Sequence, residues 1–114
     1  GVPAGVLERW GAVSPQTAAA MAQGARRAAG ADIGVALTGI AGPGGGTPEN
    51  PVGLVYLGAA CGGRVYVQKL SLGGRGRDVV RQRASQYALD AVRRLALGLP
   101  VPGAALWQES GARL

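Results

Sequence analysis

The sequence predicts an α/β protein, a three-layer α/β/α sandwich with a mixed sheet. Apolar residues recur at helical spacing over about residues 15–29 and 77–97, and three shorter apolar segments lie between these ranges. The expected order is therefore helix, strand, strand, strand, helix, and one helix on each face of a sheet gives three layers. A parallel strand is expected before the first long helix of such a unit. We therefore expect a partial domain that lacks its N-terminal strand or strands and a helix.

The helices are predicted from their ends as well as from their periodicity. A short helical turn is expected over residues 2–10, ended by Gly11. Ser14 and Pro15 mark the start of the next helix, because serine accepts a hydrogen bond from an early N–H and proline loses nothing at the first helical position. That helix runs to about Ala29, and its many small side chains allow a neighbouring element to approach closely.

Three strands are expected between the two long helices. Residues 33–38 predict a buried strand that is apolar on both faces, as in a sheet covered by helices on both sides. Residues 52–60 and 64–72 predict a hairpin whose turn is formed by residues 61–63. The second strand of this hairpin alternates apolar and polar residues more clearly than the first.

The last long helix is predicted over about residues 77–97. Its apolar stripe comprises Val80, Ala84, Tyr87, Ala88, Ala91, Val92 and Leu95. The opposite face is mostly arginine and glutamine and is expected to be solvated. The chain therefore divides into a folded unit of residues 1–97 and an irregular tail of residues 98–114, which contains several glycines and prolines.

The amino-acid composition argues against several functional classes for this protein. The net charge is +6, but aromatic residues make up 4% and phenylalanine is absent, so no stacking platform for nucleic acid is evident and we do not expect nucleic-acid binding. No apolar run approaches the ~20 residues of a membrane helix, so no membrane association is expected. Nothing resembles a signal peptide, which predicts a cytoplasmic protein. Cys61 is the only cysteine, and this excludes an internal disulfide.

The most informative segment is residues 38–53, which contain six glycines and three prolines. Loops of this length in compact domains are usually functional or disordered. One interpretation is a ligand-binding wall whose main-chain N–H groups face an anion or carbonyl; the other is an exposed, flexible loop. Thr38 ends a predicted strand, where α/β sheets bind their ligands, but a threonine that bonds to its own turn fits the position equally well.

The remaining candidates for chemistry are few. Histidine is absent, and no two carboxylates are spaced for metal binding or acid–base work, so we expect no metal and no cofactor. Arg75 or Arg77, at the turn before the last helix, could bind phosphate or carboxylate through its guanidinium fork. Arg81 and Arg83 are expected to be solvated, and Lys69 is expected to face solvent from its strand.

Several segments of the chain together resemble one known family. They are Gly11-Ala12-Val13-Ser14, Met21-Ala22, Gly24-Ala25, Thr38-Gly39-Ile40-Ala41-Gly42-Pro43-Gly44-Gly45-Gly46-Thr47, Pro51-Val52-Gly53, and Ala84 with Ala88-Leu89. This set is similar to the C-terminal domain of the competence/damage-inducible protein CinA, a family that includes stand-alone nicotinamide-nucleotide amidases. The resemblance covers about residues 2–96 and identifies residues 1–97 as the C-terminal two-thirds of such a domain.

The resemblance implies an activity and a site. The implied reaction hydrolyses the carboxamide of nicotinamide mononucleotide to nicotinate mononucleotide and ammonia, with a serine nucleophile, a lysine nearby and no metal. The implied substrate-binding residues are Thr38, Gly39, Ala41, Gly42, Pro43, Gly44, Gly45, Arg77 and Arg75. The two arginines are alternatives for one family arginine in an F-x-G-D-R motif. If Arg77 takes that place, Gly76 replaces the aspartate.

The resemblance also implies that the catalytic residues are missing from this chain. The family's serine lies in an A-E-S-C-T-G-G segment and its lysine follows an aromatic-Ser-Asn-type segment. Both are expected upstream of Gly1, and neither Ser14 nor Lys69 substitutes for them. We therefore expect no catalytic residue among residues 1–114, and this piece alone is expected to be inactive.

Two hypotheses on the parent protein follow from this expectation. The first is an amidase, with a possible further N-terminal domain. The alternative is a non-catalytic nucleotide-binding or regulatory CinA-like module linked to competence or DNA damage. The expected partners are a pyridine nucleotide and a second copy in a homodimer.

Overall fold

The computed structural model describes residues 2–42, 44–74 and 76–107. The helices and strands in these ranges are α1 (Ala4–Trp10), α2 (Pro15–Ala29), β1 (Ile33–Gly39), β2 (Leu54–Cys61), β3 (Arg64–Ser71), α3 (Arg77–Ala96) and β4 (Ala105–Trp107). Every element predicted from the sequence is present, and each end lies within two residues of its predicted position. Gly1 lies outside the described residues, so the expectation that the family's serine and lysine precede it stays a prediction.

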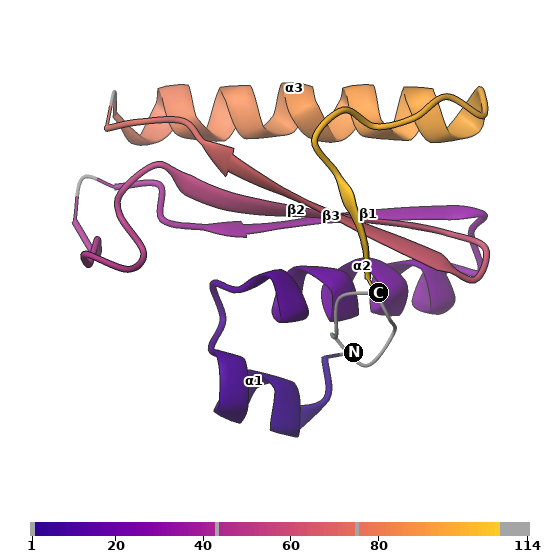
Figure 1. The fold of residues 1–114 in the computed structure, drawn as a ribbon, viewed down its shortest axis with the longest axis horizontal. Coiled ribbons are helices and arrows are strands. Elements are labelled where there is room, and N and C mark those ends of the chain that lie inside the picture. The colour runs from indigo at the N-terminus through magenta and orange to yellow at the C-terminus, as the bar shows by residue number, and fades with distance from the viewer. Residues whose placement is uncertain (1, 43, 75, 108–114) are drawn as a thin grey trace.

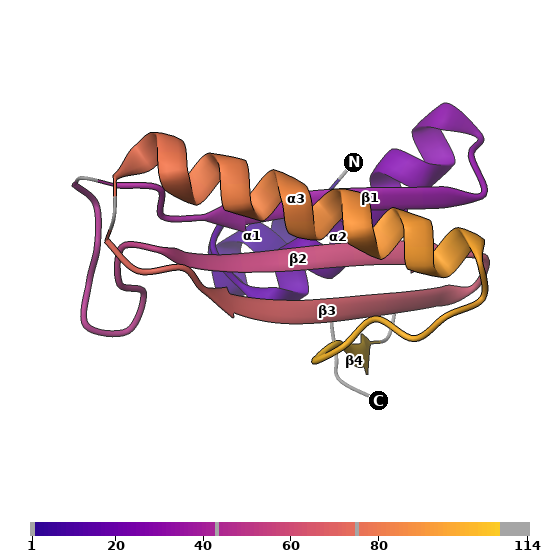
Figure 2. The same cartoon turned by 90° about the horizontal axis from the view of Figure 1, so that it is seen from above.

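The elements form three layers, as predicted. Helix α3 covers one face of the sheet, α2 covers the other, and α1 lies beyond α2 on the side away from the sheet (Figure 1). Seen from above, α3 runs along the length of the strands (Figure 2). None of the helices in the described residues has both the length and the apolar composition that crossing a membrane requires.

The described sheet has the order β1-β2-β3-β4, and each neighbouring pair is antiparallel. The prediction of a mixed sheet is therefore not met within the described strands, because no parallel pair is found among them. Register brings residues from three strands into rows across the sheet. One such row is Thr38, Tyr56 and Lys69, in which each residue lies opposite the next.

Strand β1 lies at one edge of the described sheet, which corrects its predicted full burial. Gly34 is its only buried residue, and the others are half-buried or exposed. The apolar pattern on both faces is real, but an edge strand has a neighbour on one side only, so part of its surface stays accessible.

Two apolar cores lie on the two faces of the sheet. The core under α3 comprises Val55, Leu57, Leu70, Leu72, Val80, Ala84, Ala88 and Ala91. The core under α2 comprises Ala18, Ala19, Ala22, Ala60, Val65 and Val67. Tyr87, which was predicted in the α3 stripe, is 45% exposed. At about 100° per residue, Tyr87 lies at one margin of that stripe.

Helix α2 packs unusually close to the sheet because glycine faces it from two strands. A Cβ atom on Gly34 would lie 2.5 Å from the carbonyl oxygen of Ala22, and one on Gly58 would collide with the carbonyl oxygen of Ala18. The predicted start of this helix is confirmed, since the N–H of Thr17 donates to Ser14 Oγ at 3.1 Å.

The tail after α3 is less irregular than predicted. Residues 105–107 form β4, which pairs with β3, and Trp107 packs against the core under α2. A strand of three residues is too short to give a periodic pattern in the sequence, so the prediction missed it. The rest of the predicted tail, residues 108–114, lies outside the described residues.

Candidate ligand-binding cleft

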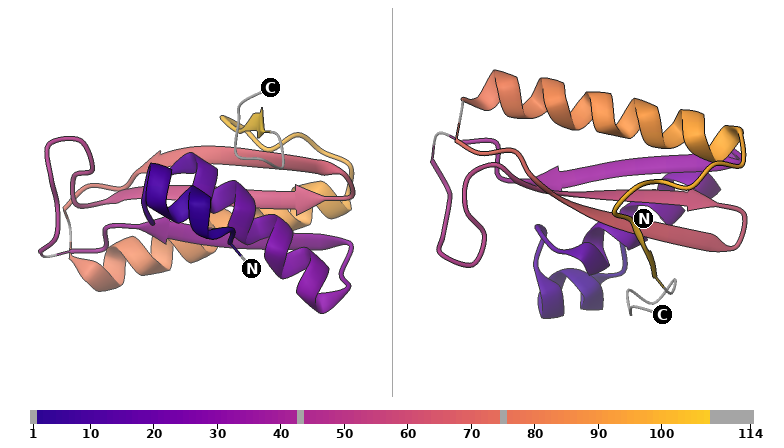
Figure 3. Two further views of the ribbon diagram at one scale, coloured as in Figure 1. Left: turned by 90° about the horizontal axis from the view of Figure 1, so that it is seen from below. Right: turned by 45° about the horizontal axis from the view of Figure 1, so that its top comes forward.

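A cleft of about 670 Å³ opens where β1 ends and α3 begins. The loop after β1 and the start of α3 lie at the same end of the molecule, as two views show (Figure 3). Three parts of the chain line the cleft: the end of β1 with its loop (Leu37, Thr38, Gly39, Ile40, Ala41, Gly42, Gly44 and Gly45), Val55 of β2, and one side of α3 (Arg77, Val80, Arg81, Ala84 and Ser85). The volume is in the range of sites for small molecules.

The loop after β1 is tied down at its base. The N–H of Ile40 donates to the carbonyl of Leu54, and the N–H of Gly53 donates back to the carbonyl of Ile40 at 2.7 Å. Farther out, a turn closes between Thr47 and Asn50, where the threonine hydroxyl accepts from the asparagine N–H at 2.9 Å. The loop is therefore fixed at two places even though residues 44–49 are exposed.

Glycine is required where this loop folds back on itself. Gly42 has a φ of +84°, and a Cβ atom there would lie 2.6 Å from Cγ1 of Val52. The main-chain N–H groups of Gly42, Gly44 and Gly45 have no hydrogen-bond partner among the described residues. All three glycines line the cleft.

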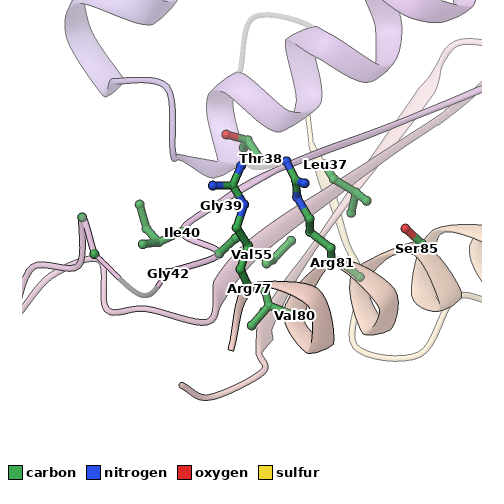
Figure 4. A pocket seen from close by; sticks show the side chains of 14 residues that line it. Leu37, Thr38, Gly39, Ile40, Gly42, Val55, Arg77, Val80, Arg81 and Ser85 are labelled. Carbon is green, nitrogen blue, oxygen red and sulfur yellow. The ribbon is translucent and has the colours of Figure 1, made fainter. Parts of the chain in front are cut away.

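Two arginines of α3 give the cleft a positive charge. Arg77 and Arg81 are exposed, line the cleft and project from α3 in the same direction, toward the end of β1 at Thr38 (Figure 4). Neither makes a hydrogen bond or ion pair with another described residue. No carboxylate is among the described residues that line the cleft, so an anionic ligand would meet no opposing charge there.

Thr38 links the cleft to the other side of the sheet. Its hydroxyl donates to the carbonyl oxygen of Ala12, in the connection between α1 and α2, at 2.6 Å. The hydroxyl thus bonds to a distant segment and not to its own turn, which was one of the two sequence-based interpretations.

The structure brings most of the predicted site residues together. Those that line the one cleft are Thr38, Gly39, Ala41, Gly42, Gly44, Gly45 and Arg77. Pro43 and Arg75 lie outside the described residues, so of the two alternative arginines only Arg77 is seen in the cleft.

Other lining residues were not predicted from the sequence. The apolar ones are Leu37, Ile40, Val55, Val80 and Ala84, and the polar ones are Arg81 and Ser85. Arg81 and Ser85 follow Arg77 at intervals of four residues, a spacing that places all three on one side of a helix. That spacing is visible in the sequence, but it does not tell which side of the helix faces the cleft.

The described residues that line the cleft do not include a general base. Ser85 is present, yet no histidine, lysine or carboxylate lies with it. Lys69 lines a separate pocket with Tyr56 and Trp107, on the α2 side of the sheet. Ser14 is buried as the cap of α2. The cleft can therefore bind a polar or anionic molecule, while no Ser–Lys pair forms in the described residues.

Fold and cleft together define an α/β domain with an arginine-lined cleft at one end of its sheet. The family described as the CinA C-terminal domain matches residues 1–96. The chain belongs to this family.

Individual relatives agree with this assignment. A CinA-like protein of Kosmotoga olearia is 56% identical over 99 residues, which are 87% of this chain and 24% of the relative. The crystal structure of the competence/damage inducible protein CihA from Agrobacterium tumefaciens matches with a TM-score of 0.80 and 43% identity, over 83% of this chain and 58% of that one. A CinA superfamily protein from Escherichia coli gives a TM-score of 0.75 and 36% identity, over 82% and 54% of the two chains.

The chain spans about a quarter of the length of the curated relatives it matches, and rather more than half of the chains in the solved structures. The matched part contains the whole of the described cleft, since its lining residues lie between Leu37 and Ser85.

Proposed function

We propose that this chain forms the substrate-binding part of a nicotinamide-nucleotide amidase of the CinA family. The substrate is nicotinamide mononucleotide, and the products are nicotinate mononucleotide and ammonia. One observation carries the proposal: a single cleft combines free main-chain amides, two arginines without described partners, and an apolar wall.

Each part of this cleft suits one part of the nucleotide. Arginine guanidinium groups bind phosphate oxygens in pairs of charge-assisted hydrogen bonds. Leu37, Ile40 and Val55 offer an apolar surface on which a pyridine ring can lie. The amides of the glycine loop can donate to ribose or carboxamide oxygens.

In this proposal the chemistry needs groups that the chain does not supply. The family's serine and lysine occur in segments that the resemblance places upstream of Gly1, and the sequence contains no Glu-Ser-Cys-Thr-Gly-Gly segment. The role of this chain is then to bind and orient the nucleotide and to shield it from water. The 114-residue chain alone is expected to bind the nucleotide and to release no ammonia from it.

A chimera tests the proposal. Residues 2–96 of this chain replace the corresponding region of the Agrobacterium tumefaciens relative, and ammonia release from nicotinamide mononucleotide is measured for both proteins. We expect the chimera to hydrolyse the nucleotide. Arg77→Gln in the chimera is expected to lower kcat/KM about 10- to 100-fold, since a hydrogen bond to a charged group contributes about 1.5–3 kcal/mol.

The control is Arg83→Gln, which removes an exposed arginine of the same helix outside the cleft. A folded chimera without activity, beside an active relative, would show that this chain does not form the amidase site. Equal effects of the two substitutions would show that Arg77 acts only through its charge at long range.

A second candidate function is nucleotide binding without catalysis. It is favoured by the absence of a general base among the described lining residues and by Gly76 where the family motif has an aspartate. This candidate predicts that the chimera binds the nucleotide by calorimetry yet releases no ammonia. The same two measurements therefore separate the two functions.

A further inference from the structure

We propose that Arg81 is the second arm of a phosphate clamp and decides whether the cleft accepts a nucleotide or a nucleoside. This inference rests on the proposed function, because it names the group that recognises the phosphate of the substrate. The sequence alone places Arg81 on a solvated face, and only the structure shows that it lines the cleft.

The geometry of α3 places the two arginines as a pair. Arg77 and Arg81 are one helical turn apart, which separates their Cα atoms by about 6 Å along the axis. Both side chains project toward the end of β1 (Figure 4). A phosphate monoester has three terminal oxygens, so one group between them can accept from both guanidinium forks.

The distribution of charges along α3 suggests that an anion binds near the N-terminal end of the helix. Near the C-terminal end, Arg93 and Arg94 both bond to Asp90, at 3.0 and 2.8 Å. Near the N-terminal end, Arg77 and Arg81 have no described partner. Two cations four residues apart repel each other, and cations oppose the helix dipole at this end. A bound dianion would attract both arginines and would also interact favourably with the helix dipole, which would offset both unfavourable interactions.

Neighbouring charges do not already supply that anion. Asp78 follows Arg77 in the sequence, but it is exposed, does not line the cleft and makes no ion pair in the described residues. The cleft therefore has two positive groups and no described negative one.

Arg83 shows what a merely solvated arginine on this helix looks like. It lies two residues beyond Arg81, is also exposed and does not line the cleft. Because Arg81 and Arg83 carry the same charge on the same helix and only Arg81 lines the cleft, Arg83 is the matched control for every test of the clamp.

The clamp predicts a specific pattern of selectivity. The phosphate of nicotinamide mononucleotide contacts both arginines, whereas nicotinamide riboside has no phosphate and so no group that binds them. Removing Arg81 should weaken the binding of every phosphate monoester by a similar factor and should not weaken the binding of the riboside, whose pyridinium ring is itself a cation. A substitution that merely disturbs the helix would weaken all ligands alike.

The test is isothermal titration calorimetry on the 114-residue chain with nicotinamide mononucleotide, nicotinamide riboside and ribose 5-phosphate. We expect Arg81→Gln to weaken the binding of both phosphate ligands about 10- to 100-fold and not to weaken the binding of the riboside. Arg81→Lys should recover part of the loss, because lysine keeps the charge without the fork. Arg83→Gln should leave all three affinities unchanged, and urea unfolding confirms that each variant is folded.

Other outcomes separate this inference from the proposed function. If the mononucleotide binds and Arg81→Gln does not weaken it, or weakens the riboside equally, the clamp is refuted while the proposed function stands. If ribose 5-phosphate binds through Arg81 and the mononucleotide binds no more tightly, the clamp stands and the pyridine-nucleotide site is refuted. If neither phosphate ligand binds the unsubstituted chain, both are refuted.

Discussion

The two faces of the sheet are packed in opposite ways. On the α2 side, alanines of the helix meet glycines of β1 and β2, and the backbones approach so closely that Gly34 and Gly58 leave no room for a methyl group. On the α3 side, larger side chains such as Leu57, Leu70 and Val80 fill the space between helix and sheet. The same face opens into the cleft at the start of the helix.

Because of this difference, the residues expected to stabilise the domain and those expected to bind a ligand are different residues. On the α2 face, close contact fixes β1 and β2 against a helix, and Gly34 and Gly58 have no room for a side chain there. The α3 face ends before the first turn of its helix is fully covered, so Arg77 and Arg81 can face a ligand without taking part in the core. We therefore expect substitutions in the cleft to change affinity, and substitutions under either helix to change the free energy of unfolding.

The largest effect is expected from a lost side chain under α3. Leu57 is 1% exposed, and Leu57→Ala should lower the free energy of unfolding by about 2–5 kcal/mol, because it removes apolar contacts and leaves a cavity. Urea unfolding followed by circular dichroism measures this loss. Leu89→Ala, at a position of α3 that is 71% exposed, serves as the control and should change little. Similar values for both variants would contradict the assigned core.

The next largest effect is expected from an added methyl group on the α2 face of the sheet. Gly58→Ala adds a methyl group that collides with the carbonyl oxygen of Ala18, a backbone atom that cannot rotate away. We expect a loss of about 1–3 kcal/mol as α2 is pushed from the sheet. Gly63→Ala, in a turn with no atom within 4 Å of the new methyl group, is the control. Unchanged stability of Gly58→Ala would show that α2 lies farther from β2 than described.

A smaller effect is expected at the start of α2. Ser14 Oγ accepts from the N–H of Thr17, so Ser14→Ala leaves that N–H without its partner. The expected loss is about 1 kcal/mol, measured by the same unfolding experiment. Ser71→Ala, an exposed serine with no described hydrogen bond from its side chain, should have no comparable effect. If both serines give the same value, the cap does not stabilise the helix.

Features of the two faces that depend on residues close together in the sequence could be predicted. The ends of α2 follow from Ser14, Pro15 and Gly30, whose chemistry acts within a few residues. The glycine loop is also one continuous segment, so its residues were expected to lie together before the structure placed them in one cleft.

The parts that depend on tertiary pairing could not be predicted. The edge position of β1 depends on which strands are its neighbours, and a strand as short as β4 leaves no pattern in the sequence. Tyr87 was misplaced for a related reason, and the exposure of Arg81 was predicted while its place in the cleft was not. Periodicity gives the sides of α3, but only packing decides which side meets the sheet, the cleft or solvent.

The smallest effect concerns the solvent side of α3, away from both cores. Hydrogen bonds from Arg94 and then from Arg93 lower the pKa of Asp90 below its ordinary value of 3.8. Since the pKa is lower in the folded state, this carboxylate stabilises the fold above its unfolded pKa, and that contribution is lost as the pH falls through the folded pKa. The side chain is exposed, so solvent screens the pair and the change in stability is expected to be slight.

Carboxyl-carbon NMR titration measures this pKa directly. Arg94→Gln should raise the pKa of Asp90 more than Arg93→Gln does, because the bond to Arg94 is the larger cause of the shift. Arg81→Gln, on the same helix but with no bond to Asp90, should leave it unchanged. A pKa that moves equally in all three variants would mean that Asp90 responds to the total charge of α3. In that case the contrast between a paired C-terminal end and an unpaired N-terminal end, on which the phosphate clamp depends, would lose its support.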